Sequence, residues 1–423
     1  MRQALIALLT SSLFVGSATA DVLTVNPSAG GSIQDAINAA AAGDTILVQG
    51  NNYVATEAVQ ISGKGLTLIG DVTFSVDFRL RRLAVFNVPV GQHVSVVNLE
   101  VGSPGGEGLI LVDNPGSLRF QDCHVTGGNG KAADTFGQVA VPGLAGARID
   151  NCADVVFTQC GIVGGRGGDV VTFNQTEASV GGAGMDIVDS TVSLFEGGAA
   201  GGRGGEVDLI YPPIGADGGI GTVSHNSDVR LHGSGIGGGA GGENDFGGNV
   251  SVAGGVGYVQ TGGASRLVLR DSAVAGGHGE GLSPDGQDQD IVDGALTGLP
   301  SSMGELFFNT DGVHREGDPM VLRGTGYPAG TQILLMTSFT PGQMFLSGRE
   351  GALVLGAPFA TELIFLANSP AITFFHTFNL GPAPNLPVGF DMVPVFLQAI
   401  EFQPESTAVL GSHEKLIVLR SGL

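Results

Sequence analysis

A four-residue glycine pattern recurs along the chain at a nearly constant interval. Gly-Gly-x-Gly begins at residues 127, 164, 201, 238 and 276, so successive copies are 37, 37, 37 and 38 residues apart. A fixed period of this length is typical of repeat proteins, in which each unit packs only against its neighbours. The chain is therefore expected to stack similar units rather than to fold around one globular core.

Alignment on these glycines brings apolar residues into three columns. Within each repeat, apolar residues alternate with others, as in short strands with one buried face. A break near Asp122 and Gln159 indicates a sharp bend between two strands. This alternation and the 73 glycines argue against a helical repeat. We expect parallel strands stacked about 4.8 Å apart. The columns are Leu118/Val155/Val192/Val229/Leu267, Phe120/Phe157/Leu194/Leu231/Leu269 and Val125/Ile162/Ala199/Ile236/Val274.

The repeats lengthen along the chain. Residues 94–101 match residues 118–125 at an offset of only 24, so the later repeats carry roughly a dozen extra residues each. The extra residues follow the glycine pattern and have similar lengths, so they are expected to stack as a ledge on one side. They are residues 132–145, 169–183, 206–220 and 243–256.

Residues 30–71 resemble the N-terminal start of pectate-lyase-like right-handed parallel β-helices. Ser32 can N-cap a short helix with Asp35 in its first turn, and one apolar face of that helix would cover the open end of the first repeat. The resemblance implies an all-β fold, a right-handed parallel β-helix over residues 21–283 with an N-terminal capping helix. It implies no single activity, because this architecture hosts lyases, hydrolases, adhesins and inert stalks.

The period ends after residue 283. Residues 284–297 are acidic and polar and are expected to form a linker. Residues 298–423 contain short apolar runs separated by turns, which predicts a C-terminal β-sandwich. This part resembles C-terminal modules found on secreted bacterial repeat proteins.

The first 20 residues have the pattern of a secretory signal peptide. A basic start, an apolar run and Ala18-Thr19-Ala20 predict cleavage before Asp21, and hence a secreted or extracellular protein. No other stretch is long and apolar enough to span a membrane. Loss of Arg2 from the 18 basic residues leaves 17 against 40 acidic residues, a net charge of −23. That balance disfavours nucleic acid and anionic lipid as partners.

One set of candidate catalytic residues lies on the strand that follows each inserted segment. Alignment of DNPGSLRF (113–120) with DNCADVVF (150–157) stacks Asp113 on Asp150. Val112 and Ile149 would then point inward, with Arg148 outward beside the two carboxylates. A shift of one residue adds Asp186 and His225 to the same face. Such groups could act as acid and base on a polysaccharide or bind a uronate, or they could be ordinary exposed polar residues. Neither the arginine-centred pattern of pectate lyases nor the Asp-Asp and His arrangement of polygalacturonases is present.

The glycine turns offer a candidate calcium site. GGRGGD, GGRGGE and GGAGGE resemble the calcium-binding nonapeptide Gly-Gly-x-Gly-x-Asp, and they place Asp169, Glu206 and Glu243 in one column. Carboxylates and turn carbonyls are the ligands that Ca²⁺ prefers. Solvated turns without metal are the alternative, because the calcium repeat has a nine-residue period and Arg166 and Arg203 could neutralise the column.

Of the three cysteines, Cys123 and Cys160 share one inward column. Stacking would bring their Cα atoms to about 4.8 Å, inside the disulfide range, but parallel side-chain directions favour buried free thiols. Cys152 lies near a turn and has no equivalent cysteine.

Two classes of function remain open. The first is a secreted structural or surface-interaction protein whose partner is a polysaccharide or a cell-surface component. The second is a polysaccharide lyase or glycoside hydrolase that uses the exposed strand face. The scarcity of lysine, the lack of tryptophan and the negative charge favour the first class. The sequence does not indicate an oligomeric state.

Overall fold

The computed structural model describes most of the repeat region and part of the C-terminal region. The described residues form two compact units, one within residues 23–298 and one within residues 299–423. The expected signal peptide, residues 1–20, lies outside them. The described residues are 21–49, 58–70, 79–135, 138–170, 178–207, 215–242, 252–270, 272–279, 285–291, 295–298, 305–308, 313–325, 332–338, 341–344, 353–355, 359–366, 376–383, 392–402 and 409–419.

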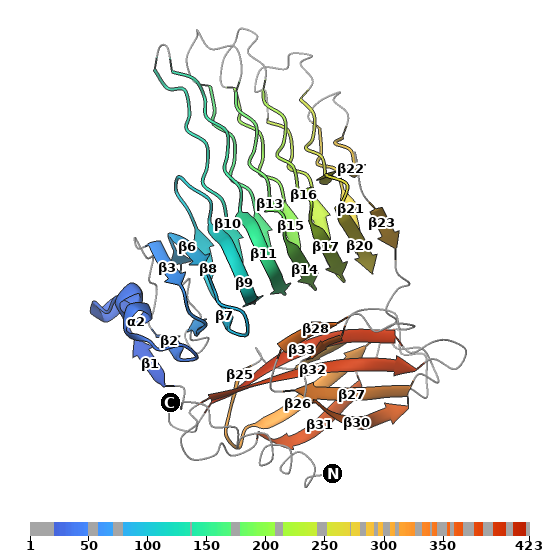
Figure 1. The fold of residues 1–423 in the computed structure, drawn as a ribbon. Helices are drawn as coiled ribbons and strands as arrows, with labels where there is room; N and C mark the ends of the chain where they lie inside the picture. Colours follow the sequence, from blue (N-terminus) through green and yellow to red (C-terminus); the bar gives the residue numbers. More distant parts are fainter. Residues whose placement is uncertain are drawn as a thin grey trace. The chain divides into compact units, whose positions relative to one another are not determined.

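The first unit consists of parallel strands in two large sheets. Each sheet gains its strands in chain order, as the colour sequence in Figure 1 shows. The 16-stranded sheet contains β1 (Val22–Val25), β2 (Thr45–Val48), β3 (Ala58–Ser62), β4 (Thr67–Gly70), β6 (Arg82–Phe86), β7 (His93–Val97), β9 (Leu109–Gln121), β11 (Ala147–Thr158), β13 (Met185–Val188), β14 (Thr191–Phe195), β16 (Thr222–His225), β17 (Asp228–His232), β19 (Tyr258–Thr261), β20 (Arg266–Arg270), β22 (Gln289–Ile291) and β23 (Ala295–Gly298). The seven-stranded sheet contains β5 (Arg79–Leu80), β8 (Glu100–Gly102), β10 (His124–Thr126), β12 (Gly161–Val163), β15 (Gly198–Ala200), β18 (Gly235–Gly237) and β21 (Ala273–Ala275).

The predicted apolar columns are confirmed as neighbours across the strands. Val155 pairs with Leu118 on one side and Val192 on the other, and Phe157 pairs with Phe120 in the same way. The rings of Phe120 and Phe157 stack with centroids 5.0 Å apart. All fifteen column members lie in the buried core or pack against it, so contacts between equivalent side chains build the core repeat by repeat.

The predicted bend is also present. Asn98, Asp122, Gln159, Glu196 and Gly233 all have positive φ, between 51° and 57°. The left-handed region is costly for residues other than glycine, asparagine and aspartate. At this corner, one left-handed residue in each repeat turns the chain from the large sheet into the seven-stranded sheet.

The inserted segments form two extended limbs in each of the later repeats. They run away from the strands in Figure 1, outward and then back. Each limb is bonded to other limbs through its backbone. We call the described limbs the glycine blade: outgoing limbs 127–133, 164–170, 201–207 and 238–242, and returning limbs 140–146, 178–184, 215–221 and 252–257. The predicted stacking of the inserts is confirmed for these residues.

Hydrogen bonds within the glycine blade have a three-residue period. The N–H groups of Gly167 and Val170 donate to the outgoing limb of the next repeat, and that of Gly164 donates to Ala200, directly before that limb. Those of Gly165 and Gly168 donate to the returning limb of the previous repeat. Three residues per turn is the period of an extended polyproline II-type chain, which makes no hydrogen bonds within itself. Every limb therefore depends on its neighbours for its hydrogen bonds.

A short helix, α2 (Ile33–Ala39), follows a single turn, η1 (Pro27–Ala29). The hydroxyl of Ser32 accepts a hydrogen bond from the N–H of Asp35, and Ile33 and Ile37 are buried in the core. The side-chain amide of Gln34 bonds to both the N–H and the carbonyl of Gln60 in β3. It satisfies the backbone of that strand as a neighbouring strand would.

The expected linker over residues 284–297 is wrong in the described positions. β22 pairs with β19 and β23 pairs with β20, both in parallel, so these strands extend the large sheet. The sequence did not indicate β22 and β23, because this acidic segment has too few apolar residues to show the apolar–polar alternation of a strand.

The second unit is composed of strands in three small sheets, which pair antiparallel except for β25 and β33. Within the described part of the chain, no helix is long and apolar enough to cross a membrane. The sheets contain β24 (Glu305–Phe308), β26 (Pro319–Thr325) and β31 (His376–Pro382); β25 (Val313–Arg315), β33 (Val409–Leu419), β32 (Met392–Phe402), β27 (Gln332–Ser338) and β30 (Phe359–Leu366); and β28 (Pro341–Met344) and β29 (Leu353–Leu355).

Candidate functional site

The outward face of β11, β13 and β16 holds four of the five candidate catalytic residues. Arg148 lies opposite Asp186 on the next strand. Asp150 lies opposite Val188, and His225 lies opposite Val188 from the other side. Two strand spacings, roughly 10 Å, therefore separate Asp150 from His225. Arg148, Asp150 and Asp186 form a compact group, and His225 lies apart from it.

The predicted stacking of Asp113 on Asp150 is wrong. Asp150 lies opposite Val112, and Asp113 accepts a 2.7 Å hydrogen bond from the side chain of Asn151. β9 has one more residue than β11 beyond this point, where the register shifts, so an alignment from the later columns is displaced by one position. Val112 is consequently half-exposed on the outward side. Leu111 occupies the buried position that had been predicted for Val112.

The electrostatics of the compact group centre on Asp186. Burial raises its pKa above the ordinary value, and the charges of Asp150 and Glu107 raise it further. The Arg148 guanidinium opposes the rise, and it also lies 3.4 Å from the Asp150 carboxylate. A carboxyl group of raised pKa beside a second carboxyl group and an arginine is an arrangement that can transfer a proton. Glu107 was not predicted to belong to this group, because no acidic residue occupies the equivalent position of another repeat.

His225 is held by two side chains. Its Nδ1 is 3.0 Å from the hydroxyl oxygen of Thr261, and its Nε2 is 3.1 Å from the amide nitrogen of Asn226. With that amide donating to Nε2, the ring proton lies on Nδ1 and is donated to Thr261. The contacts hold the imidazole in place away from the carboxylates.

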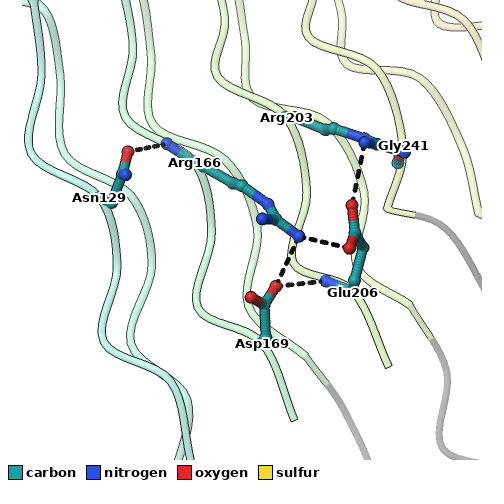
Figure 2. Close-up of polar contacts among 6 residues, drawn as sticks. All are labelled: Asn129, Arg166, Asp169, Arg203, Glu206 and Gly241. Carbon is teal, nitrogen blue, oxygen red and sulfur yellow. Dashed lines mark hydrogen bonds and ion pairs between the residues drawn. The ribbon is translucent and has the colours of Figure 1, made fainter. Parts of the chain in front are cut away.

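On the glycine blade, the predicted carboxylate column is interleaved with arginines (Figure 2). The Arg166 guanidinium lies 2.9 Å from Asp169 and 2.8 Å from Glu206, and thus links two repeats. Arg203 lies 2.9 Å from the other oxygen of Glu206. The backbone N–H of Glu206 donates a 2.7 Å hydrogen bond to Asp169. The backbone N–H of Arg166 donates to Asn129 in the previous repeat.

This network contains two arginines and two carboxylates, so its formal charges cancel. Glu243, the third predicted calcium ligand, lies outside the described residues. Among those described, no group of three or more histidine, cysteine, aspartate or glutamate side chains is arranged to hold a metal ion. Asp169 and Glu206 are the residues from which a calcium site would be built, together with turn carbonyls.

Comparison with known proteins supplies no family. No protein-family model matches the chain, and no curated protein matches it. Among solved structures, ORF18 of Geobacillus virus E2 is 11% identical, and the match covers 92% of this chain and 81% of that chain with a TM-score of 0.22. At that TM-score the match says nothing about the fold or the function.

Proposed function

We propose that the chain is a secreted structural or surface-interaction protein whose partner is a polysaccharide or another cell-surface component. Its fold is taken to be a right-handed parallel β-helix of the pectate-lyase-like type, with α2 covering its first repeat and a β-sandwich at its C-terminus. Parallel strands added in chain order and the buried position of Ile33 and Ile37 in α2 support this assignment.

The observation that carries the functional proposal is the glycine blade. Its backbone groups bond to one another across repeats, and four of its charged side chains, Arg166, Asp169, Arg203 and Glu206, pair with one another. Groups that satisfy each other hold a surface in one shape and lower the entropy lost when a partner binds. A preformed, charge-balanced blade is suited to contact rather than to chemistry.

The test is a binding and cleavage screen of residues 21–423 on immobilised polysaccharides, including uronic-acid polymers, with and without Ca²⁺. We expect at least one polymer to be bound without release of reducing ends or unsaturated products. Arg166→Gln should weaken binding by opening the ion pairs of the blade. Arg79→Gln removes an arginine from an ion pair with Glu100 outside the blade and should leave binding intact. Cleavage of any polymer, or equal loss in both variants, would contradict the proposal.

The second candidate, a polysaccharide lyase or glycoside hydrolase, is favoured by the raised pKa of Asp186 beside Arg148 and Asp150. If any polymer is cleaved, Asp150→Asn should reduce the rate by at least ~100-fold, the lower end for general acid–base catalysis. Asp113→Asn is the matched control, because Asp113 bonds to Asn151 instead. Full activity of Asp150→Asn would exclude this face.

A further inference from the structure

Cys123 and Cys160 occupy the same corner of two successive repeats. Each directly precedes a strand of the seven-stranded sheet, and those strands pair His124 with Gly161. The N–H of Gly161 donates a 3.0 Å hydrogen bond to the carbonyl of Cys123, which fixes the register at the corner itself. The two cysteines therefore face each other across one strand spacing.

Both side chains point into the core as free thiols. They are 3% and 2% exposed. Cys123 donates to the carbonyl of Gln121, and Cys160 makes the equivalent contact with Thr158, each at 3.2 Å. Burial is the main reason that the pKa of Cys160 is raised, and a hydrogen bond with the Cys123 thiol adds to it. The two side chains thus enter the core from equivalent positions of two successive repeats.

Later repeats show what this corner requires. The equivalent residues are Gly197, Ser234 and Ser272, and each serine hydroxyl accepts a hydrogen bond from the N–H of the preceding repeat's residue. A small residue or a hydroxyl therefore suffices for the fold. Two thiols in adjacent repeats have a property that serines lack, because they can be joined by oxidation.

We propose that Cys123 and Cys160 are an oxidisable dithiol that forms a disulfide between two successive repeats. Directly opposed Cα atoms lie about 4.8 Å apart, inside the range of 4.4–6.8 Å that a disulfide spans. Both residues stand at a corner, between strands, where a small rotation is easier than within a sheet.

The oxidation needs a partner disulfide, such as that of a small thiol compound or a thiol–disulfide oxidoreductase. Because both thiols are buried, the reaction requires a local opening of the corner. One thiol then ionises, attacks the partner disulfide and forms a mixed disulfide, and one partner thiol leaves. The second cysteine then attacks the mixed disulfide and releases the other partner thiol. The pair loses two electrons and two protons, and the partner disulfide is reduced to two thiols.

Cys152 is not part of the pair. It is buried at a different corner, where its sulfur lies 3.5 Å from the amide of Asn114 and 3.4 Å from the carbonyl of Asp150. The equivalent residue in the next repeat is Ser190, whose hydroxyl accepts a hydrogen bond from the N–H of Cys152. Serine at position 152 therefore suits the fold, and Cys152→Ser is the matched control.

The experiment treats residues 21–423 with oxidised glutathione, then denatures the protein, alkylates free thiols and identifies the cross-linked tryptic peptides. Trypsin leaves Cys152 and Cys160 in one peptide, so the assignment is made in Cys152→Ser. We expect alkylated cysteines to fall from three to one in the native chain and from two to none in Cys152→Ser. The cross-link should join residues 120–131 to residues 149–166. Closing the 37-residue loop should raise the Tm by about 5 °C or more.

Cys160→Ser should fold, because serine stands at the equivalent corner of later repeats, and should show neither the cross-link nor the rise in Tm. Full alkylation of the oxidised native chain would overturn the proposal. So would a cross-link that includes Cys152 or joins two chains. The readout does not depend on whether the blade binds a polysaccharide, so the two proposals fail independently.

Discussion

Phe157 shows how far a residue depends on its equivalents in neighbouring repeats. Its ring stacks on Phe120, its backbone lies opposite Leu194, and it is 1% exposed. Phe157→Ala should lower the free energy of unfolding by ~3–5 kcal/mol, because the lost ring leaves a cavity between two repeats. Denaturant unfolding measures the change, with the exposed Val90→Ala as the control. A change near zero for Phe157→Ala would contradict its place in the core.

The raised pKa of Asp186 predicts how the stability of the chain depends on pH. Its pKa in the folded chain lies above the ordinary value of 3.8, so the folded state holds this proton more tightly than the unfolded state. Its contribution to stability is present below pH 3.8 and is lost as the pH rises through the raised pKa. Asp186→Asn should remove this loss. We expect the variant to gain stability relative to the native chain in the window above pH 3.8, measured in thermal unfolding series at increasing pH. An unchanged difference across that window would show that Asp186 ionises normally.

The residues of the site were only partly predictable. Arg148, Asp150 and Asp186 were found because residues that alternate with buried apolar positions must point outward. Asp113 was misplaced because one extra residue in β9 shifts the register, and glycine-anchored alignment cannot detect a shift between two anchors. The arginine contacts of Asp169 and Glu206 were foreseen as one of two outcomes, since only the structure shows which side chains meet.

At the scale of the element, the limbs of the glycine blade depend on the absence of side chains. A Cβ atom on Gly165 would overlap the carbonyl oxygen of Gly128 in the neighbouring limb. Gly165→Ala should therefore separate the limbs and increase amide hydrogen exchange in residues 127–133 and 164–170. Exchange in β11 and β14 should stay slow. Gly105→Ala is the control, because no atom lies within 4 Å of a Cβ there. Equal exchange in the two variants would mean that the limbs are not packed as described.

The strands were predictable and the limb geometry was not. Alternating apolar residues at a 37-residue offset predict parallel stacking directly, and the paired registers confirm it. The limbs have no alternation, since glycine has no side chain to bury. Their three-residue hydrogen-bond period arises from contacts among four or more separate segments, which no local pattern records.

At the scale of the whole molecule, most of the negative charge must be carried outside the blade network. Because two arginines balance the two described carboxylates there, we expect the Tm of the native chain to be equal in chelator and in millimolar Ca²⁺. Arg166→Gln should create a Ca²⁺-dependent rise, because Asp169 and Glu206 then lack a shared cation. A rise in the native chain that Glu206→Gln abolishes would instead establish the calcium site.

The hydrogen-bonded limbs also give the molecule an uneven response to temperature. Buried apolar side chains in the described limbs are few and small. They form a cluster of Ala133, Ala140, Val170 and Val207, with Ala178 against it, and also include Ala216 and Val252. Little apolar surface means a small heat-capacity change when the limbs separate. The hydrophobic contribution to the stability of the strand core weakens on cooling, whereas the backbone hydrogen bonds of the limbs do not depend on the hydrophobic effect. The blade should therefore keep its stability in the cold better than the core that supports it, and lose order first on heating.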